Sequence, residues 1–328
     1  MRDLDTASRV VFFVPVLLLL LKYPIKTCVL SYSIPLGSII SLCVALYDKF
    51  ILNLRPEQNP RIMHIQGGDI SMSLGIFSLI IALYAHQKKD VRLTTLSVIG
   101  GLCGIVGSLL STARGGWVAL PVLLIVIPYI YRHSLSKRFF LTFFGIIVVA
   151  SIGISQLPNN RIMERINVAQ KDIQLYLDKN NGNTSLGARF EMWKSAIAMA
   201  KEKPLFGWGI QGATEKRKQE TKEKIATGNI GQFTHAHNQY LDDLSKRGIV
   251  GLLALLAVLF IPLRAFMKKL NTKNDEVKLI ATLGVAHVLS VMIYGLSQGF
   301  LVHNSGTIFY FFLTIVFYAA IRTHQKAE

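Results

Sequence analysis

Apolar segments long enough to cross a bilayer constrain the fold of this chain more than any other feature. Nine can be read, over residues 8–21, 27–47, 69–85, 94–112, 117–131, 139–156, 248–267, 279–297 and 302–321. A membrane-spanning helix needs about 20 mostly apolar residues, and several of these segments lie near the lower limit. Because lipid offers no hydrogen bonds to the backbone, each segment should be helical. We therefore predict an all-α polytopic membrane protein of about nine transmembrane helices. Pro15 interrupts the first segment, so eight spans are the alternative.

Composition agrees with a membrane protein and excludes other classes. Hydrophobic residues make up 51% of the 328 residues, and 36 Lys and Arg stand against 19 Asp and Glu. This balance argues against a soluble enzyme or a disordered chain. A basic excess in a polytopic protein is typical of cytoplasmic loops, so we expect no nucleic-acid partner. The three cysteines lie far apart without a CxxC, which predicts neither a disulfide framework nor a thiolate metal site.

Basic residues gather in alternate loops and set the expected orientation. The loops at 86–92, 132–138 and 264–278, together with the C-terminal tail, should face the cytoplasm. The other short loops and the long segment 157–247 should then face outward. This count places the N-terminus outside without an evident signal peptide. We therefore expect either a miscounted first span or an N-terminally shortened chain.

The segment 157–247 is the one long stretch without a span, and we predict that it is the functional insert. Its periodicity indicates partial helical order. The chain then divides into N-terminal transmembrane helices (1–156), a large loop (157–247) and C-terminal transmembrane helices (248–328). Within the loop, the run 215–224 is rich in Lys and Glu and predicts a solvated helix or flap.

An amphipathic helix is predicted in this loop. Apolar side chains recur at spacings of three and four at Leu186, Phe190, Trp193, Ile197 and Ala200. Thr184 or Ser185 can cap its start, and Pro204 follows its end. Arg189 would lie in or beside the first turn, where a cation opposes the helix dipole. An anion shared with the helix N-terminus would compensate, as would pairing with Glu191 or a lipid phosphate.

Two further places could carry chemistry. Arg114 ends a predicted span before Gly115 and Gly116, which should allow a tight turn between spans. Charge at the lipid boundary is costly unless paired, and this arginine faces outward, so a functional role and an anchoring role are both open. His235 and His237 precede the seventh span. Their i,i+2 spacing should make the rings diverge, which is a poor zinc pattern, so we predict no metal site.

A histidine near neutral pH can instead accept a proton from a hydroxyl group. The alternative is that both rings are hydrogen-bonded to the backbone. The segment Pro204–Gly212 is glycine-rich but lacks the pattern of a nucleotide-binding loop, so it more simply supplies a shaped turn.

Together these residues resemble the O-antigen ligase family of membrane proteins, the Wzy-C type. Three pieces carry the resemblance within residues 108–256: the Arg114 turn; Ser185-Leu186-Gly187-Ala188-Arg189-Phe190-x-x-Trp193 leading into Pro204-Leu205-Phe206-Gly207-x-Gly209; and His235-x-His237-Asn238-x-x-Leu241 leading into Arg247-Gly248-Ile249-Val250-Gly251-Leu252. The Ser-Leu-Gly-Ala-Arg form is most similar to lipopolysaccharide O-antigen ligases. Such proteins typically have about a dozen spans, with the large periplasmic loop after the ninth. Here the loop follows the sixth predicted span.

The resemblance implies a GT-C-like fold in the bacterial inner membrane, with the active site on the periplasmic side. It implies an inverting, metal-independent glycosyltransferase that needs no cofactor. The donor would be O-antigen on undecaprenyl diphosphate and the acceptor a sugar hydroxyl of lipid A-core, amid membrane lipids. By resemblance, Arg114 and Arg189 would bind the diphosphate, His237 would orient or deprotonate the acceptor hydroxyl, and His235 would support it.

Structural roles are expected for Asp242 and Asp243, which could also orient Arg247. The alternatives within the family are an O-antigen polymerase and a protein O-oligosaccharyltransferase. A transporter of lipid-linked sugars would need polar residues deep in the spans. The mid-span segments are almost purely apolar apart from His287, which favours a satisfied buried histidine and disfavours a transporter. A membrane scaffold without chemistry is the remaining alternative.

Overall fold

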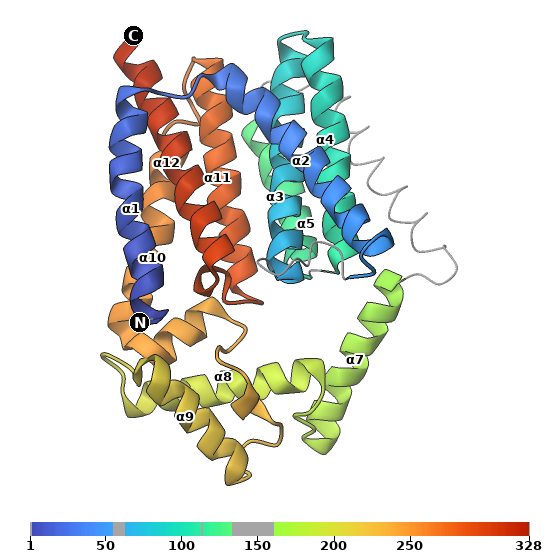
Figure 1. Ribbon diagram of the computed structural model, residues 1–328, viewed down its shortest axis with the longest axis vertical. Coiled ribbons are helices and arrows are strands. Elements are labelled where there is room, and N and C mark those ends of the chain that lie inside the picture. The colour runs from blue at the N-terminus through green and yellow to red at the C-terminus, as the bar shows by residue number, and fades with distance from the viewer. Residues whose placement is uncertain (1, 55–62, 113, 133–160, 328) are drawn as a thin grey trace. The chain divides into compact units, whose positions relative to one another are not determined.

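The computed structural model describes residues 2–54, 63–112, 114–132 and 161–327 (Figure 1). The described residues are helical and form two compact units. The first unit comprises Met1–Ile130 and Leu256–Glu328, and the second comprises Tyr131–Leu255.

The first unit holds most of the membrane helices. Its elements are α1 (Arg2–Lys22), α2 (Thr27–Phe50), α3 (His64–Gln87), α4 (Val91–Ser111), α5 (Arg114–Ile130), α11 (Asp275–Gly295), the short 3₁₀ helix η2 (Phe300–Val302) and α12 (Asn304–Ala327). The second unit holds α7 (Arg161–Lys179), α8 (Ser185–Glu202), α9 (Gly209–Lys222) and the 3₁₀ helix η1 (Ile230–Gln232). Helix α10 (Gln239–Met267) begins in the second unit and continues into the first, with a kink at Gly248.

The helices confirm a polytopic membrane protein. Among the described residues, α2, α3, α4, α10, α11 and the part of α12 up to His324 are long and apolar enough to span a bilayer. The shorter apolar helices Val10–Lys22 and Gly115–Ile130 match the first and fifth predicted segments. Pro15 lies inside α1, which continues through it. The sixth predicted segment, 139–156, lies outside the described residues.

Helices α3 and α11 are the most buried spans of the first unit. Small residues let α3 approach α4 closely, because a Cβ atom on Gly104 would lie 2.5 Å from the Cα of Gly75. His287 on α11 is fully buried, and its Nε2 lies 3.0 Å from the carbonyl oxygen of Tyr310. The prediction of a satisfied histidine is therefore confirmed only for Nε2, because the buried Nδ1 has no hydrogen-bond partner among the described residues.

Helix α3 also carries polar residues that the hydropathy pattern concealed. Gln66 and Asp69 are fully buried, and Ser73 lies 2.9 Å from the hydroxyl of Tyr294. The prediction about His287 concerned the middle of the spans, whereas Gln66 and Asp69 lie at the N-terminal end of α3. The predicted span began only at residue 69, so its apolar pattern did not reveal the polar residues at the start of α3.

Candidate functional site

Helix α8 forms as predicted, with Thr184 at its N-cap. The side-chain oxygen of Thr184 accepts a hydrogen bond from the backbone N–H of Gly187 at 3.0 Å. The predicted buried face is only partly right, since Ile197 is exposed while Met192, Ala196 and Met199 are buried. The core on which α8 packs consists of Met192, Ala196, Ile230 and Ala236, so later segments of the loop select the buried face.

Two glycines bring the start of α8 against a distant segment. A Cβ on Gly228 would lie 2.1 Å from the carbonyl oxygen of Gly182, so the two backbones touch where no side chain fits. Buried Glu191 also holds these two segments together. Its carboxylate accepts hydrogen bonds from the hydroxyl of Tyr176 at 2.5 Å and from the backbone N–H of Thr227 at 2.9 Å.

The surroundings of Glu191 favour its ionised form. Burial opposes ionisation, but the hydrogen bonds from Tyr176 and Thr227 and the charge of Lys194 outweigh it and lower the pKa of the carboxyl. Lys194 makes the ion pair with Glu191 at 3.4 Å. Glu191 therefore serves as a fixed anion that joins α8 to the segment before η1.

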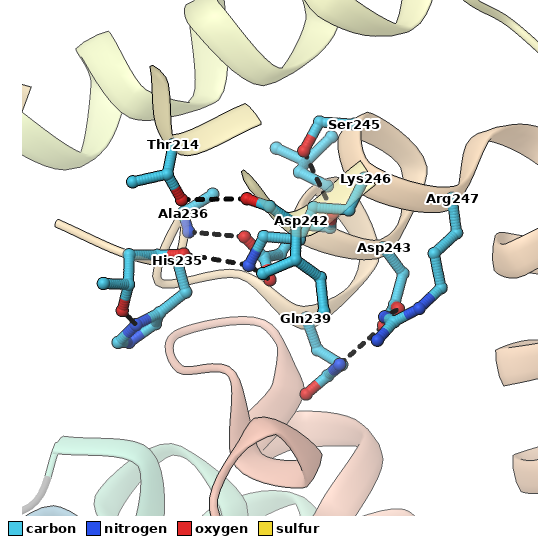
Figure 2. A network of polar contacts seen from close by, with 12 residues as sticks. Thr214, His235, Ala236, Gln239, Asp242, Asp243, Ser245, Lys246 and Arg247 are labelled. Carbon is cyan, nitrogen blue, oxygen red and sulfur yellow. Dashed lines mark hydrogen bonds and ion pairs between the residues drawn. The ribbon is translucent and has the colours of Figure 1, made fainter. Parts of the chain in front are cut away.

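The segment that carries the two histidines, residues 234–238, is held from several sides; we call it the histidine loop (Figure 2). The indole N–H of Trp193 donates to the carbonyl oxygen of Ala236 at 3.0 Å. The backbone N–H of Ala236 donates to Asp242 at 2.9 Å. Lys246 donates both to Asp242 at 2.6 Å and to the carbonyl oxygen of Thr234 at 2.9 Å.

Arg217 completes this network from α9. Its side chain is fully buried and donates to the carbonyl oxygen of Thr234 at 3.0 Å. Burial lowers the pKa of Arg217, and the nearby carboxylates of Asp242 and Glu220 oppose that shift. The expectation of a solvated helix or flap over 215–224 is therefore wrong for the inner face of α9. Sequence reasoning missed Arg217 because it stands among exposed Lys and Glu residues.

The aspartates have the structural roles that we expected. Asp242 fixes the histidine loop, and Asp243 pairs with Arg247 and accepts a hydrogen bond from Gln239 at 2.6 Å. Asn238 caps the following helix, since its side-chain oxygen accepts from the backbone N–H groups of Tyr240 and Leu241.

The two histidine rings lie together, contrary to the expectation that they diverge. Their centroids are 4.4 Å apart, and the ring of Phe233 lies 5.5 Å from that of His237. The cause is the backbone at His237, which adopts the left-handed conformation with φ of 48°. His237 thus belongs to neither a strand nor a helix, and the spacing rules of those elements do not apply.

A pocket of about 300 Å³ lies between the start of α8 and the histidine loop. Arg189 and His237 both line it, although they are distant in the sequence. The other lining residues are Gly182, Asn183, Thr184, Ser185, Ala188, Met192, Asn229, Gln232 and Phe233. His235 is buried beside His237. The first turn of a helix, a guanidinium group and an imidazole therefore share one cavity.

The glycine-rich turn after α8 docks on the kink of α10. The backbone N–H of Ile249 donates to the carbonyl oxygen of Pro204 at 2.8 Å, and that of Trp208 donates to the carbonyl oxygen of Ser245 at 3.0 Å. Gly207 and Gly248 both have positive φ, and a Cβ on either would collide with the backbone of the other segment. This backbone junction holds the end of α8 against α10.

Arg114 begins α5 in the first unit, whereas Arg189, His235 and His237 lie in the second. The expected turn at Gly115 and Gly116 is wrong, because both lie inside α5 and the chain reverses at Thr112, which has φ of 60°. Their smallness serves packing instead. A Cβ on Gly115 would lie 2.8 Å from Asp69, so this buried carboxylate faces the first turn of α5.

Among the described residues, no group of three or more His, Cys, Asp or Glu is placed to hold a metal ion. The three cysteines are free thiols. Arg189 and His237 line the pocket together with the first turn of α8, and the ring of His235 lies beside that of His237.

The fold and the pocket together define a class: polytopic helical membrane proteins in which a folded polar unit with its own pocket is inserted, along the sequence, before the last spans. Residues 99–256, which contain this unit, match the O-antigen ligase family. An uncharacterised protein of Haemophilus influenzae is 42% identical over 316 residues, covering 96% of this chain and 79% of that protein. The chain belongs to the O-antigen ligase family.

Two named relatives are more distant. The O-antigen ligase of Escherichia coli is 24% identical over 266 residues, covering 78% of this chain and 61% of that protein. The exopolysaccharide production protein ExoQ of Rhizobium meliloti is 27% identical over 124 residues, covering 36% of this chain and 28% of that protein. The chain thus spans less than two thirds of the length of either named relative.

Proposed function

We propose that this chain is an inner-membrane glycosyltransferase that moves O-antigen from undecaprenyl diphosphate to a sugar hydroxyl of lipid A-core at the periplasmic face. Family membership supports a transferase of the ligase or polymerase kind. The observation that carries the proposal is the pocket in which Arg189 and His237 meet at the start of α8. It offers a cation for a diphosphate and a base for a hydroxyl within one cavity.

In this proposal Arg189 binds the donor diphosphate together with the first turn of α8. A guanidinium group can hold phosphate oxygens with two parallel hydrogen bonds, and the exposed N–H groups of a helix N-terminus add to the attraction. The same charges stabilise the diphosphate as it leaves. Arg114, at the start of α5, is the second proposed diphosphate ligand.

His237 is the proposed partner of the acceptor hydroxyl. Its imidazole takes the hydroxyl proton while the acceptor oxygen bonds to the anomeric carbon of the donor sugar. The bond from that carbon to the diphosphate oxygen breaks with its electron pair, and the anomeric configuration inverts. His235, 4.4 Å from His237 between ring centroids, is the proposed support for the ring of His237. Because the donor is already activated, this step uses no nucleotide sugar and, as proposed, no metal ion.

A polymerase that uses a lipid-linked glycan as both donor and acceptor is the second candidate. The similarity to an exopolysaccharide production protein supports this second candidate. The same pocket would serve both reactions, since they differ in the acceptor and share the departure of a diphosphate.

Complementation of a strain that lacks its O-antigen ligase tests the proposal. The wild-type chain should restore a lipopolysaccharide ladder on gels. Arg114→Ala, Arg189→Ala and His237→Ala should each reduce the ladder at least tenfold with unchanged membrane abundance. Arg189→Lys should also fail, because lysine lacks the planar fork of donors. A normal ladder from any variant would remove that residue from the site.

The polymerase is tested in a strain that lacks O-antigen polymerase. That strain makes lipopolysaccharide whose core carries a single repeat. If the chain restores a ladder there but not in the ligase-deficient strain, it is the polymerase. Activity of the purified protein should also survive a chelator. Loss with EDTA and recovery with added metal would contradict the metal-independent step.

A further inference from the structure

The turn between α8 and α9 projects two large apolar side chains away from the protein; we call Leu205 and Phe206 the apolar tip. Their side chains are 60% and 74% exposed. A contiguous exposed apolar patch is a sign of an interaction site, whereas single exposed apolar side chains are common.

The tip is fixed at the start of the apolar part of α10. The backbone N–H of Ile249 donates to the carbonyl oxygen of Pro204 at 2.8 Å, and that of Val250 donates to the carbonyl oxygen of Leu205 at 3.3 Å. The positive φ angles of Gly207 and Gly248 permit this close approach. The tip therefore lies at the level of the first turn after the kink.

The length of α10 sets the depth of that turn in a bilayer. From Ile249 to Met267 the helix rises about 28 Å at 1.5 Å per residue. The hydrocarbon core of a bilayer is about 30 Å thick, so this segment has to use its whole length to cross. Ile249 then lies at the hydrocarbon boundary, and the tip that is bonded to it lies there too. Ile249, Val250 and Leu253 are themselves exposed apolar side chains.

The residues around the tip have the chemistry of a membrane interface. Trp208 follows the tip, and its ring lies 4.0 Å from the ammonium nitrogen of Lys203 and 5.1 Å from that of Lys216. Arg247 precedes the kink, and its side chain is half exposed. Tryptophan and basic residues gather at headgroup level, where an amphipathic ring and a cation contact both the apolar layer and lipid phosphates.

We propose that Leu205 and Phe206 insert into the bilayer leaflet in which α10 begins, with Lys203 and Arg247 at the level of the lipid phosphates. The tip is thus a membrane anchor for the turn that joins α8 to α9. This inference is independent of the proposed transferase activity. In this arrangement the first turn of α8 lines the pocket, and the turn that follows the last residue of α8 is held at the lipid surface.

Spin labelling tests the anchor in the full-length chain. Phe206→Cys and Leu205→Cys are each placed in a background where Cys28, Cys43 and Cys103 are replaced by Ala. Ile225→Cys is the matched control, since Ile225 is 67% exposed in the same unit but lies between α9 and η1. The proteins are reconstituted into nanodiscs of phosphatidylethanolamine and phosphatidylglycerol, and label accessibility is measured by power-saturation electron paramagnetic resonance.

Labels at 205 and 206 should be several-fold more accessible to oxygen, which partitions into lipid, than to an aqueous nickel chelate. The label at 225 should show the reverse. Nickel preference at both tip positions would overturn the proposal, and so would protection from both reagents, which would mean that protein covers the tip. Oxygen preference at 225 as well would show that the contact is not specific to the tip. Because two neighbouring positions are labelled, failure of one variant to fold leaves the other as the test.

Discussion

At the scale of single residues, the candidate site depends on buried charges that do no chemistry themselves. Asp242 is fully buried and binds both the backbone of Ala236 and the ammonium group of Lys246. Asp243 pairs instead with Arg247, whose side chain is half exposed. The two adjacent aspartates therefore form a natural comparison between a buried ion pair and one that water can replace.

Asp242→Ala should destabilise the second unit by about 3–5 kcal/mol, because it leaves the buried ammonium of Lys246 without its carboxylate. Asp243→Ala should cost about 1 kcal/mol, since Arg247 can turn into water. Heat-induced unfolding in detergent, followed by tryptophan fluorescence, measures the difference. The double variant Asp242→Leu with Lys246→Met should recover most of the loss. Equal effects of the two alanine substitutions would contradict this reading of the network.

Glu191 gives the site a dependence on pH. The pKa of its carboxyl lies below the ordinary value of 4.5, so the carboxylate contributes stability above that pH. That contribution is lost as the pH falls through the lower pKa of the folded state. Glu191→Gln should therefore unfold at a lower temperature than the wild type at pH 7, and the gap should close as the solution is acidified below pH 4.5. A gap that stays constant down to pH 3 would show that ionisation of Glu191 is not the cause.

At the scale of elements, the docking of the glycine-rich turn on the α10 kink explains why two separate motifs occur together. Gly248 has φ of 64°, and its Cβ would lie 2.3 Å from the backbone of Leu205. Gly209 also has positive φ, of 71°, but its Cβ would meet nothing within 4 Å. Substitutions at these two glycines therefore separate the cost of a left-handed backbone from the cost of a steric clash.

Gly209→Ala should cost about 1–2 kcal/mol, the expense of a left-handed conformation for an L-residue. Gly248→Ala should cost more, because the added methyl group also pushes the turn away from α10. Limited proteolysis between α8 and α9 gives the readout, with faster cleavage expected only for Gly248→Ala. Similar cleavage of both variants would mean that the two segments are not held together by close backbone contact.

The elements also show what the sequence could and could not predict. Hydropathy predicted the spans because lipid exposure is a local property of each segment. Thr184 and Pro204 predicted both ends of α8 through cap and turn chemistry. The buried face of α8 was predicted only in part, because Met192 and Ala196 pack on Ile230 and Ala236, which come much later in the chain.

For the molecule as a whole, the sequence predicted the types of the candidate residues better than their surroundings. Arg189 and His237 were predicted by resemblance, and the structure places both in one pocket. The close approach of the two histidine rings could not be predicted, since it depends on one left-handed residue. The burial of Arg217 and Asp69 was likewise hidden, because it arises from tertiary contacts that no local pattern records.

We propose that glycan transfer takes place in the pocket between the start of α8 and the histidine loop. Two alanines on α8 allow a direct test. Ala188 lines this pocket, whereas Ala198 lines a separate pocket of about 210 Å³ with Glu191 and Glu220. The measurement is the rate of glycan transfer by purified, reconstituted protein that carries Ala188→Trp or Ala198→Trp.

Ala188→Trp should fill the pocket and lower transfer at least a hundredfold, while Ala198→Trp should keep at least half of the wild-type rate. Both variants should keep the wild-type unfolding temperature to within a few degrees. Near-normal transfer by a folded Ala188→Trp protein would contradict the claim and place the reaction elsewhere.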